Sequence, residues 1–487
     1  MVEADLSTTL TPARRRIAFY LLLLGAFMPS FNMFVVTIAL PVIRDALAAS
    51  ASEASLVVSA YTSAYAVCLI TGGRLGDLYG RRLMFLIGMA GFVATSLMCG
   101  LAPSIALLVG ARVLQGMFAA LMAPPVLAGI RTLFSPEEIP WALNVYGTGI
   151  GVAVAGGQFL GGMLISLDAW GLGWRLAFLV NLPIGIVALA VVPFLVPESG
   201  SRERPRMDYG GVLLLSAALA SFIVPLSIGR GEHWAPWVLA LLAASLPLLG
   251  AFLAFERRLA RRGGMPILDA ALLQIGSFRR GLVVAFLFFF TAPFYVFFSL
   301  YLQAGLSRTP LAAGLAVLPY GIANFLGPML ATRFPAAARP YLFGVGMALE
   351  LLGYGGIALC AALQIGGWAI FIVIFTAGFG QGIAMPEMIN AILGEVPRNH
   401  TGLAAGMMNS TLQIGSSISV PAIGSIFFAM LGDGTTPADY GHALGVAIGS
   451  QIAVLGLSML LGLRNGRRSV RDGGRAAADA APRRAGR

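Results

Sequence analysis

Long apolar runs constrain the fold of this chain more than any other feature of its sequence. Each is about the length of a helix that crosses a bilayer. Of the 487 residues, only 11% are charged, whereas a soluble domain carries about 25%. The sequence therefore predicts an all-α integral membrane protein with 14 transmembrane helices, at residues 17–40, 54–72, 83–101, 104–130, 141–166, 176–196, 210–229, 235–254, 281–302, 311–333, 341–362, 368–393, 401–430 and 441–463.

Two polar, arginine-rich segments, 197–209 and 256–280, divide the predicted helices into groups of six, two and six. These boundaries define five predicted units along the chain. They are a cytoplasmic N-terminal tail (1–16), a first six-helix half (17–197), linkers with two extra helices (198–280), a second six-helix half (281–463) and a basic, disordered cytoplasmic tail (464–487).

The placement of arginine predicts the topology. All 32 basic residues are Arg, and 27 of them fall in cytoplasmic segments if the N-terminus is inside. External loops then hold four, which are Arg44, Arg175, Arg230 and Arg308. This asymmetry follows the positive-inside rule. It predicts a multi-pass protein of the plasma (inner) membrane with cytoplasmic N- and C-termini, and it explains the net charge of +11 without a nucleic-acid partner.

The residue types exclude several kinds of chemistry. Without Lys, the chain has neither a phosphate-binding loop of the G-x-x-x-x-G-K type nor a Schiff-base nucleophile. Cys68, Cys99 and Cys360 lie in separate apolar runs, and the three His are far apart in sequence, so no metal-ligand spacing exists. We therefore expect no enzymatic activity, no cofactor and no metal.

One short segment, residues 73–82, combines glycine and charge between two apolar runs. Its glycines permit a sharp turn, so we expect a tight loop at the membrane surface. The segment resembles a loop signature of the major facilitator superfamily. In that family the loop is cytoplasmic and helps lock the outward-facing state, which implies a conformational role for Gly73, Asp77, Gly80, Arg81 and Arg82.

Arg112 is the only Arg inside an apolar run. A charge at mid-bilayer costs at least ~2.5–3.5 kcal/mol, so the side chain either faces a cavity or partner, or snorkels to the surface. With Gln115 and Gly116 it resembles the superfamily's fourth-helix motif, in which the arginine takes part in proton transfer. A fainter copy around Gln381 predicts two pseudo-symmetric halves, as in the major facilitator fold.

Further segments resemble the fourteen-helix drug/proton antiporters of that superfamily. Residues 174–185 resemble one of their motifs, and the end of the fifth helix resembles their glycine-rich antiporter motif. Small residues there let helices approach closely in lipid. The resemblance implies cavity or helix-packing roles for Asn32, Gln115, Gly116, Gly157, Gln158, Gly161, Gly162 and Gln303.

The chain departs from that family where proton coupling is concerned. Asn32 replaces an acid and cannot titrate, and Gln158 replaces a proline. Two other acids, Glu350 and Glu387, lie within apolar runs, where burial disfavours the charged form. Each is either a proton carrier or a structural residue at the surface or between helices. With Arg112 they are the proton-coupling candidates, and Glu387 is favoured because the resemblance places it on a cavity-lining helix.

The resemblance implies a secondary active transporter whose halves rock about a central cavity. We expect proton-coupled efflux of hydrophobic small molecules or drugs. The alternatives are a same-fold exporter of a lipid, siderophore or metabolite, and a transporter without proton coupling. The expected partners are a small hydrophobic substrate, protons and the lipid bilayer, and the protein is expected to act as a monomer.

Overall fold

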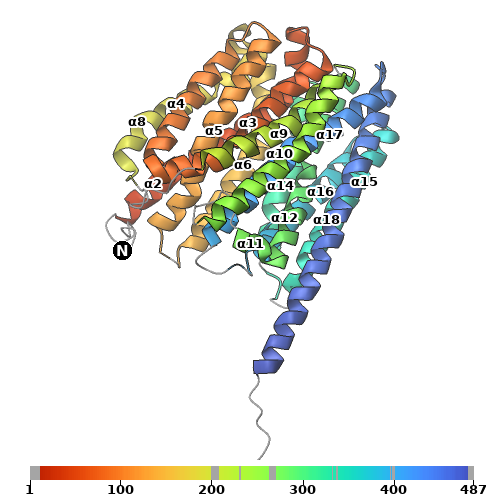
Figure 1. Ribbon diagram of the computed structural model, residues 1–487. Helices are drawn as coiled ribbons and strands as arrows, with labels where there is room; N and C mark the ends of the chain where they lie inside the picture. Colours follow the sequence, from red (N-terminus) through yellow and green to blue (C-terminus); the bar gives the residue numbers. More distant parts are fainter. Residues whose placement is uncertain are drawn as a thin grey trace, which may run out of the picture.

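A computed structural model describes residues 11–135, 137–198, 208–229, 232–262, 270–331, 333–335, 338–394, 396 and 401–480. Every regular element in these residues is a helix (Figure 1). By length and composition, 13 helices can cross a membrane, and a further apolar helix lies at Glu53–Leu69. All fourteen predicted helices therefore have a helical counterpart, and the fold class predicted from the sequence is confirmed.

The first six predicted helices appear in chain order. Side-chain caps start three of them, with Thr11, Ser50 and Ser104 accepting hydrogen bonds from backbone N–H groups three residues later. The elements are α2 (Pro12–Ala46), α3 (Ala51–Tyr79), α4 (Arg81–Gly100), α5 (Ile105–Leu133), α6 (Ile139–Leu167), the short η1 (Ala169–Gly171), η2 (Gly173–Arg175) and α7 (Leu176–Leu179), and α8 (Asn181–Leu195).

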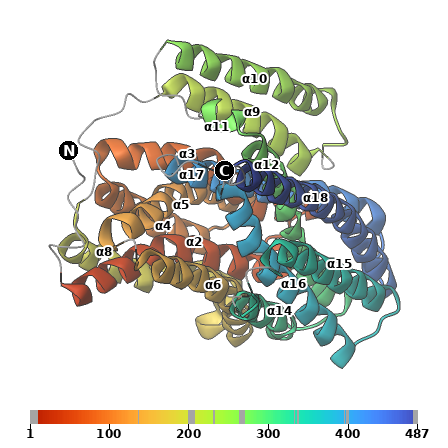
Figure 2. The ribbon, with the colours of Figure 1, turned by 90° about the horizontal axis from the view of Figure 1, so that it is seen from below.

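The two extra helices, α9 (Tyr209–Ile228) and α10 (Pro236–Arg261), pack on each other at the edge of the bundle (Figure 2). Helix α9 also contacts α3 and α17, one from each half. The second half contains α11 (Ala270–Gln274), α12 (Gly276–Phe288), η3 (Phe289–Thr291), α13 (Pro293–Leu300), η4 (Tyr301–Gly305), α14 (Pro310–Ala331), α15 (Arg339–Ala362), α16 (Trp368–Leu393), α17 (Thr401–Leu431) and α18 (Pro437–Ala480).

Two sequence predictions about local structure are wrong. The expected loop at 73–82 is a break at a single residue, because α3 continues to Tyr79 and α4 begins at Arg81. Gly80 has a φ of 107°, which turns the chain without further residues. The expected disordered tail is helical from 464 to Ala480, because α18 continues into a segment rich in Ala and Arg, which favour helix.

The two halves meet through α6 and α14. We call the end of the bundle that carries residue 12 and residue 480 the tail end, and the other the far end (Figure 1). Near the far end, a Cβ built on Gly162 would lie 2.4 Å from the carbonyl oxygen of Pro310. One on Gly321, nearer the middle, would lie 2.3 Å from the Cβ of Ala155. The small residues thus allow direct backbone contact between the halves.

The same face of α6 is open towards the tail end. Gly147 and Gly151 precede Ala155 by two turns and one turn, so they share its face. A Cβ on either residue would meet no atom within 4 Å. On the other interface, Ser417 of α17 donates to the Thr62 carbonyl at 2.8 Å, whereas Gly406 has open space. The halves therefore touch at the far end and separate towards the tail end.

Candidate functional site

Arg112 lies in the second turn of α5, about 10 Å from the far end of that helix, and its side chain is fully buried. Its Nε donates to the carbonyl oxygen of Val57 at 2.8 Å. Its Nη1 donates to Asn32 Oδ1 at 2.6 Å and to Gln115 Oε1 at 2.7 Å. Helices α2, α3 and α5 therefore converge on one guanidinium, and the side chain does not snorkel.

Aromatic and polar groups surround this guanidinium. The Tyr61 ring lies 3.9 Å from the Arg112 Cζ, within the range of a cation–π contact. Gln115 also donates to Ser96 Oγ of α4 at 2.7 Å. Within the described part of the chain, Arg112 forms no ion pair with an Asp or Glu side chain. The first half thus buries a positive charge, and this charge is hydrogen-bonded to two side-chain amides and one backbone carbonyl.

Glu350 is the matching buried charge-bearing group of the second half. It lies midway along α15 and is fully buried. The Thr291 side chain interacts with this carboxyl group, although neither carboxyl oxygen meets the geometry of a hydrogen bond. The carboxyl interacts electrostatically with Tyr295, Tyr320 and Tyr354, which come from α13, α14 and α15. Although α15 is peripheral, this side chain faces the interior of its half.

A network of hydroxyl groups lies beside Glu350. Tyr320 OH donates to Gln381 Oε1 of α16 at 2.9 Å, and it lies 3.4 Å from Tyr354 OH. Thr291 Oγ1 bonds the Tyr354 hydroxyl. Sequence reasoning missed Thr291 and both tyrosines. A signal was available, since Tyr354 follows Glu350 by four residues and so shares its helix face.

Glu387 is half-buried near the tail end of α16, directly after Pro386. It lies six residues from Gln381 along the same helix. Glu350 and Glu387 therefore lie in different environments. Glu350 is enclosed, whereas Glu387 is partly accessible.

Three of the glycines singled out in the sequence, Gly116, Gly157 and Gly161, lie directly against a neighbouring helix. A Cβ on Gly116 would lie 2.4 Å from the Tyr61 carbonyl oxygen, and one on Gly157 would lie 2.9 Å from that of Phe31. Gly161 contacts Val35. The fully buried Gln158 has two unpaired side-chain polar atoms.

Gln303 of η4 reaches across to the first half. Its Nε2 donates to the Ile38 carbonyl oxygen at 3.0 Å. The rings of Phe34 on α2 and Tyr295 on α13 meet edge to face, with centroids 4.8 Å apart. Helix α2 therefore carries both Asn32 and the contacts that close the far end.

Gly80 and Arg82 make contacts at the tail end. Arg82 pairs with Glu198, with Nε and Oε2 3.7 Å apart, and its backbone N–H donates to Glu198 Oε1 at 3.0 Å. A Cβ on Gly80 would lie 2.8 Å from the Glu198 carboxyl group. The side chain of Asp77 lies outside the described residues. Its predicted pairing with Arg81 therefore stays a prediction.

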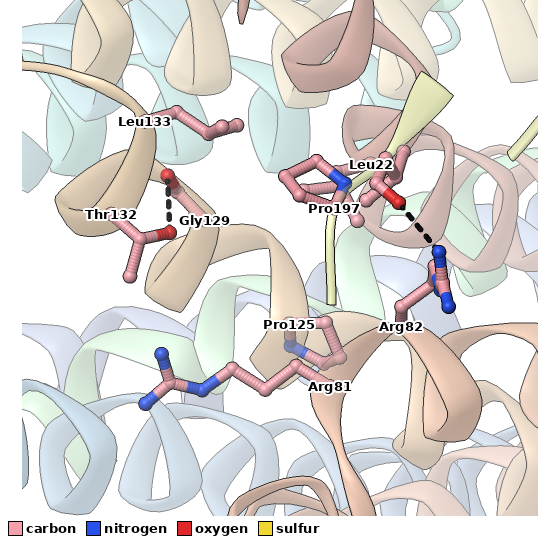
Figure 3. A pocket seen from close by; sticks show the side chains of 9 residues that line it. Leu22, Arg81, Arg82, Pro125, Gly129, Thr132, Leu133 and Pro197 are labelled. Carbon is pink, nitrogen blue, oxygen red and sulfur yellow. Dashed lines mark hydrogen bonds between the residues drawn. The ribbon is translucent and has the colours of Figure 1, made fainter. Parts of the chain in front are cut away.

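A small hollow lies beside these residues, and Figure 3 shows it from close by. The side chains of Arg81 and Arg82 point in different directions (Figure 3). Arg82 donates to the Val196 carbonyl oxygen at 3.3 Å, which ties the start of α4 to the end of α8. The hollow is lined by Leu22, Arg81, Arg82, Pro125, Gly129, Thr132, Leu133, Val196 and Pro197.

Replacing Gly80 with Ala is expected to destabilise the protein by about 1–3 kcal/mol, because φ is 107° and the new Cβ would press on Glu198. Thermal unfolding in detergent measures the effect. Gly147→Ala is the matched control, since it adds the same methyl group to a helical position with open space. Equal unfolding temperatures for the two variants would contradict this account of Gly80.

Comparison with known proteins identifies the family to which this architecture belongs. A family model described as Major Facilitator Superfamily matches residues 22–420. The chain is 35% identical over 435 residues to the "Probable actinorhodin transporter" of Streptomyces coelicolor, covering 87% of this chain and 75% of that protein. It is 32% identical to the "Puromycin resistance protein pur8" of Streptomyces alboniger, covering 88% and 86%.

A further relative and a solved structure agree with this family. The chain is 28% identical to the "Multidrug efflux pump LfrA" of Mycolicibacterium smegmatis, over 93% of this chain and 90% of that one. The crystal structure of a bacterial homolog of the human lysosomal transporter Spinster superposes with a TM-score of 0.66 at 17% identity, covering 95% and 99%. This chain is a multi-pass membrane transporter and belongs to the major facilitator superfamily.

Proposed function

We propose that this protein exports hydrophobic small molecules, antibiotics among them, across the inner membrane. The observation that carries the proposal is the pair of interfaces that touch at the far end and separate towards the tail end. Such a shape admits a substrate from one side only, and rocking of the halves would present it to the other. Relatives named for antibiotic transport, resistance and multidrug efflux support the substrate class.

The tail end faces the cytoplasm in this proposal, because most of the arginine lies in segments at that end. The structure then corresponds to an inward-open state. A single chain suffices, since both halves and their closing contacts lie within it. Transport of a fluorescent drug into inverted vesicles, compared with vesicles lacking the protein, tests export. Lipid, siderophore or metabolite transport without drug transport would favour the alternative substrates.

Cysteine labelling tests the orientation. A single cysteine at Ser469 is expected to react with a membrane-impermeant maleimide only from the cytoplasm, and one at Asp433 only from outside. The background replaces Cys68, Cys99 and Cys360 with Ser, and the unmodified background is the control. External labelling of Ser469→Cys in intact cells would reverse the proposed orientation.

We further propose that export is driven by protons and that Glu350 carries them. An enclosed carboxyl group favours its protonated form, whereas contact with water favours the carboxylate. Opening and closing of the surrounding helices would therefore load and release a proton. The hydroxyls of Tyr320 and Tyr354 lie within electrostatic range of the carboxyl group, and in this state they bond Gln381 and Thr291 instead. Glu387, the favourite from sequence, becomes the second candidate.

A further inference from the structure

Hydrogen-bond donors without acceptors accumulate around Arg112. A guanidinium has five N–H groups, and three are used on Val57, Asn32 and Gln115. Nη2 of Arg112 and Nδ2 of Asn32 have no partner, although both side chains are fully buried. These two nitrogens together carry four N–H groups without an acceptor. The site therefore has more hydrogen-bond donors than acceptors.

Among the described residues, no Asp or Glu side chain forms an ion pair with Arg112. Arginine keeps its proton in proteins, and an unpaired buried charge is strongly destabilising. The Tyr61 ring covers the guanidinium at 3.9 Å, but an aromatic face does not neutralise it. Asn32 stands next to the charge at 2.6 Å and contributes only an amide oxygen. A bound anion would supply both the missing charge and the missing acceptors.

We propose that the Arg112–Asn32 pair binds the carboxylate or phenolate group of an aromatic acid that this protein exports. The inference rests on the proposed export function and narrows its substrate class. A carboxylate that displaced the Asn32 amide oxygen would accept from Nη1 and Nη2 together, which is the bidentate geometry that guanidinium favours.

The residues around the guanidinium favour an acid whose anionic group is attached to an aromatic ring system. Tyr61 and Phe178 flank the guanidinium, with Phe178 5.9 Å from its Cζ. Phe34 lies half a turn beyond Asn32, on the opposite face of α2, and contacts Tyr295 of the other half. Asn32 and the far-end closure thus share helix α2.

Isothermal titration of the purified full chain tests the inference, with anthraquinone-2-carboxylate and its neutral methyl ester as probes. Wild type is expected to bind the carboxylate at least about tenfold more tightly than the ester, as charge-assisted hydrogen bonds imply. Asn32→Asp places an internal carboxylate beside Arg112 and is expected to abolish this preference. Arg112→Gln is expected to abolish it as well, and decides the matter if Asn32→Asp fails to fold.

Gln451→Glu is the matched control. It makes the same change from amide to acid at a buried position of the second half, where Gln451 donates to the Phe290 carbonyl. Gln451→Glu is expected to keep the preference for the carboxylate over the ester. Equal binding of the two probes by wild type, or a preference that survives Arg112→Gln, overturns the inference.

Chloride distinguishes an organic anion from an inorganic one. Titration in chloride and in gluconate buffer should give the same preference for the carboxylate over the ester. Loss of this preference in chloride would assign the site to an inorganic ion and overturn the proposed substrate class. The transport assay in inverted vesicles tests the export function separately. Protein that prefers the carboxylate but moves no drug into inverted vesicles refutes the export proposal and leaves the anion site standing.

Discussion

Glu350→Gln is expected to abolish accumulation of a drug driven by an imposed pH gradient in proteoliposomes, with a loss of at least about tenfold. The amide keeps the shape of the side chain and cannot titrate. Because Glu350 is enclosed, its protonation is the step that we link to the movement of the second half. The measurement is substrate uptake into vesicles with an acidic lumen.

Three results separate the possibilities. Glu350→Gln should still bind the drug, which excludes misfolding as the cause of the loss. Glu387→Gln is the comparison, because the sequence favours that residue as the carrier. Uptake that is lost in Glu387→Gln and normal in Glu350→Gln would return the role to Glu387. A wild type that ignores the gradient would favour transport without proton coupling.

A disulfide across the far end is expected to stop transport, by at least about tenfold, and a reductant should restore it. Ser166 of α6 accepts a hydrogen bond from the backbone N–H of Leu311 on α14 at 3.2 Å. Cysteines at these two positions are therefore close enough to join, and the bond would hold the halves in the closed arrangement described here. Drug efflux before and after oxidation measures the effect.

The matched control is the pair Ser166→Cys and Gly147→Cys, which lie on one helix and cannot tie the halves together. The three native cysteines are replaced in both backgrounds. Oxidised Ser166→Cys/Leu311→Cys protein that transports at the rate of the reduced protein would contradict rocking of the halves about the α6–α14 contact.

Much of the fold was predictable because a bilayer restricts the choices. Backbone groups in lipid must bond within their own segment, so each long apolar run had to become a helix. The run lengths therefore determined the helix count and the six-two-six order. Arg112 was predictable as a site for the same reason, since a lone charge in an apolar run needs partners. Local details were not, because a single glycine with positive φ replaced the expected loop.

Only the tertiary structure decided which buried groups meet. Sequence identified Asn32 as a missing acid, but its 2.6 Å bond to Arg112 depends on how α2 packs against α5. The Tyr320 network joins residues far apart in the chain, and the hydropathy of their helices does not indicate which face turns inward. The ranking of Glu350 over Glu387 likewise follows from burial. The length of an apolar run specifies a helix in lipid, whereas packing between helices decides which way each polar side chain faces.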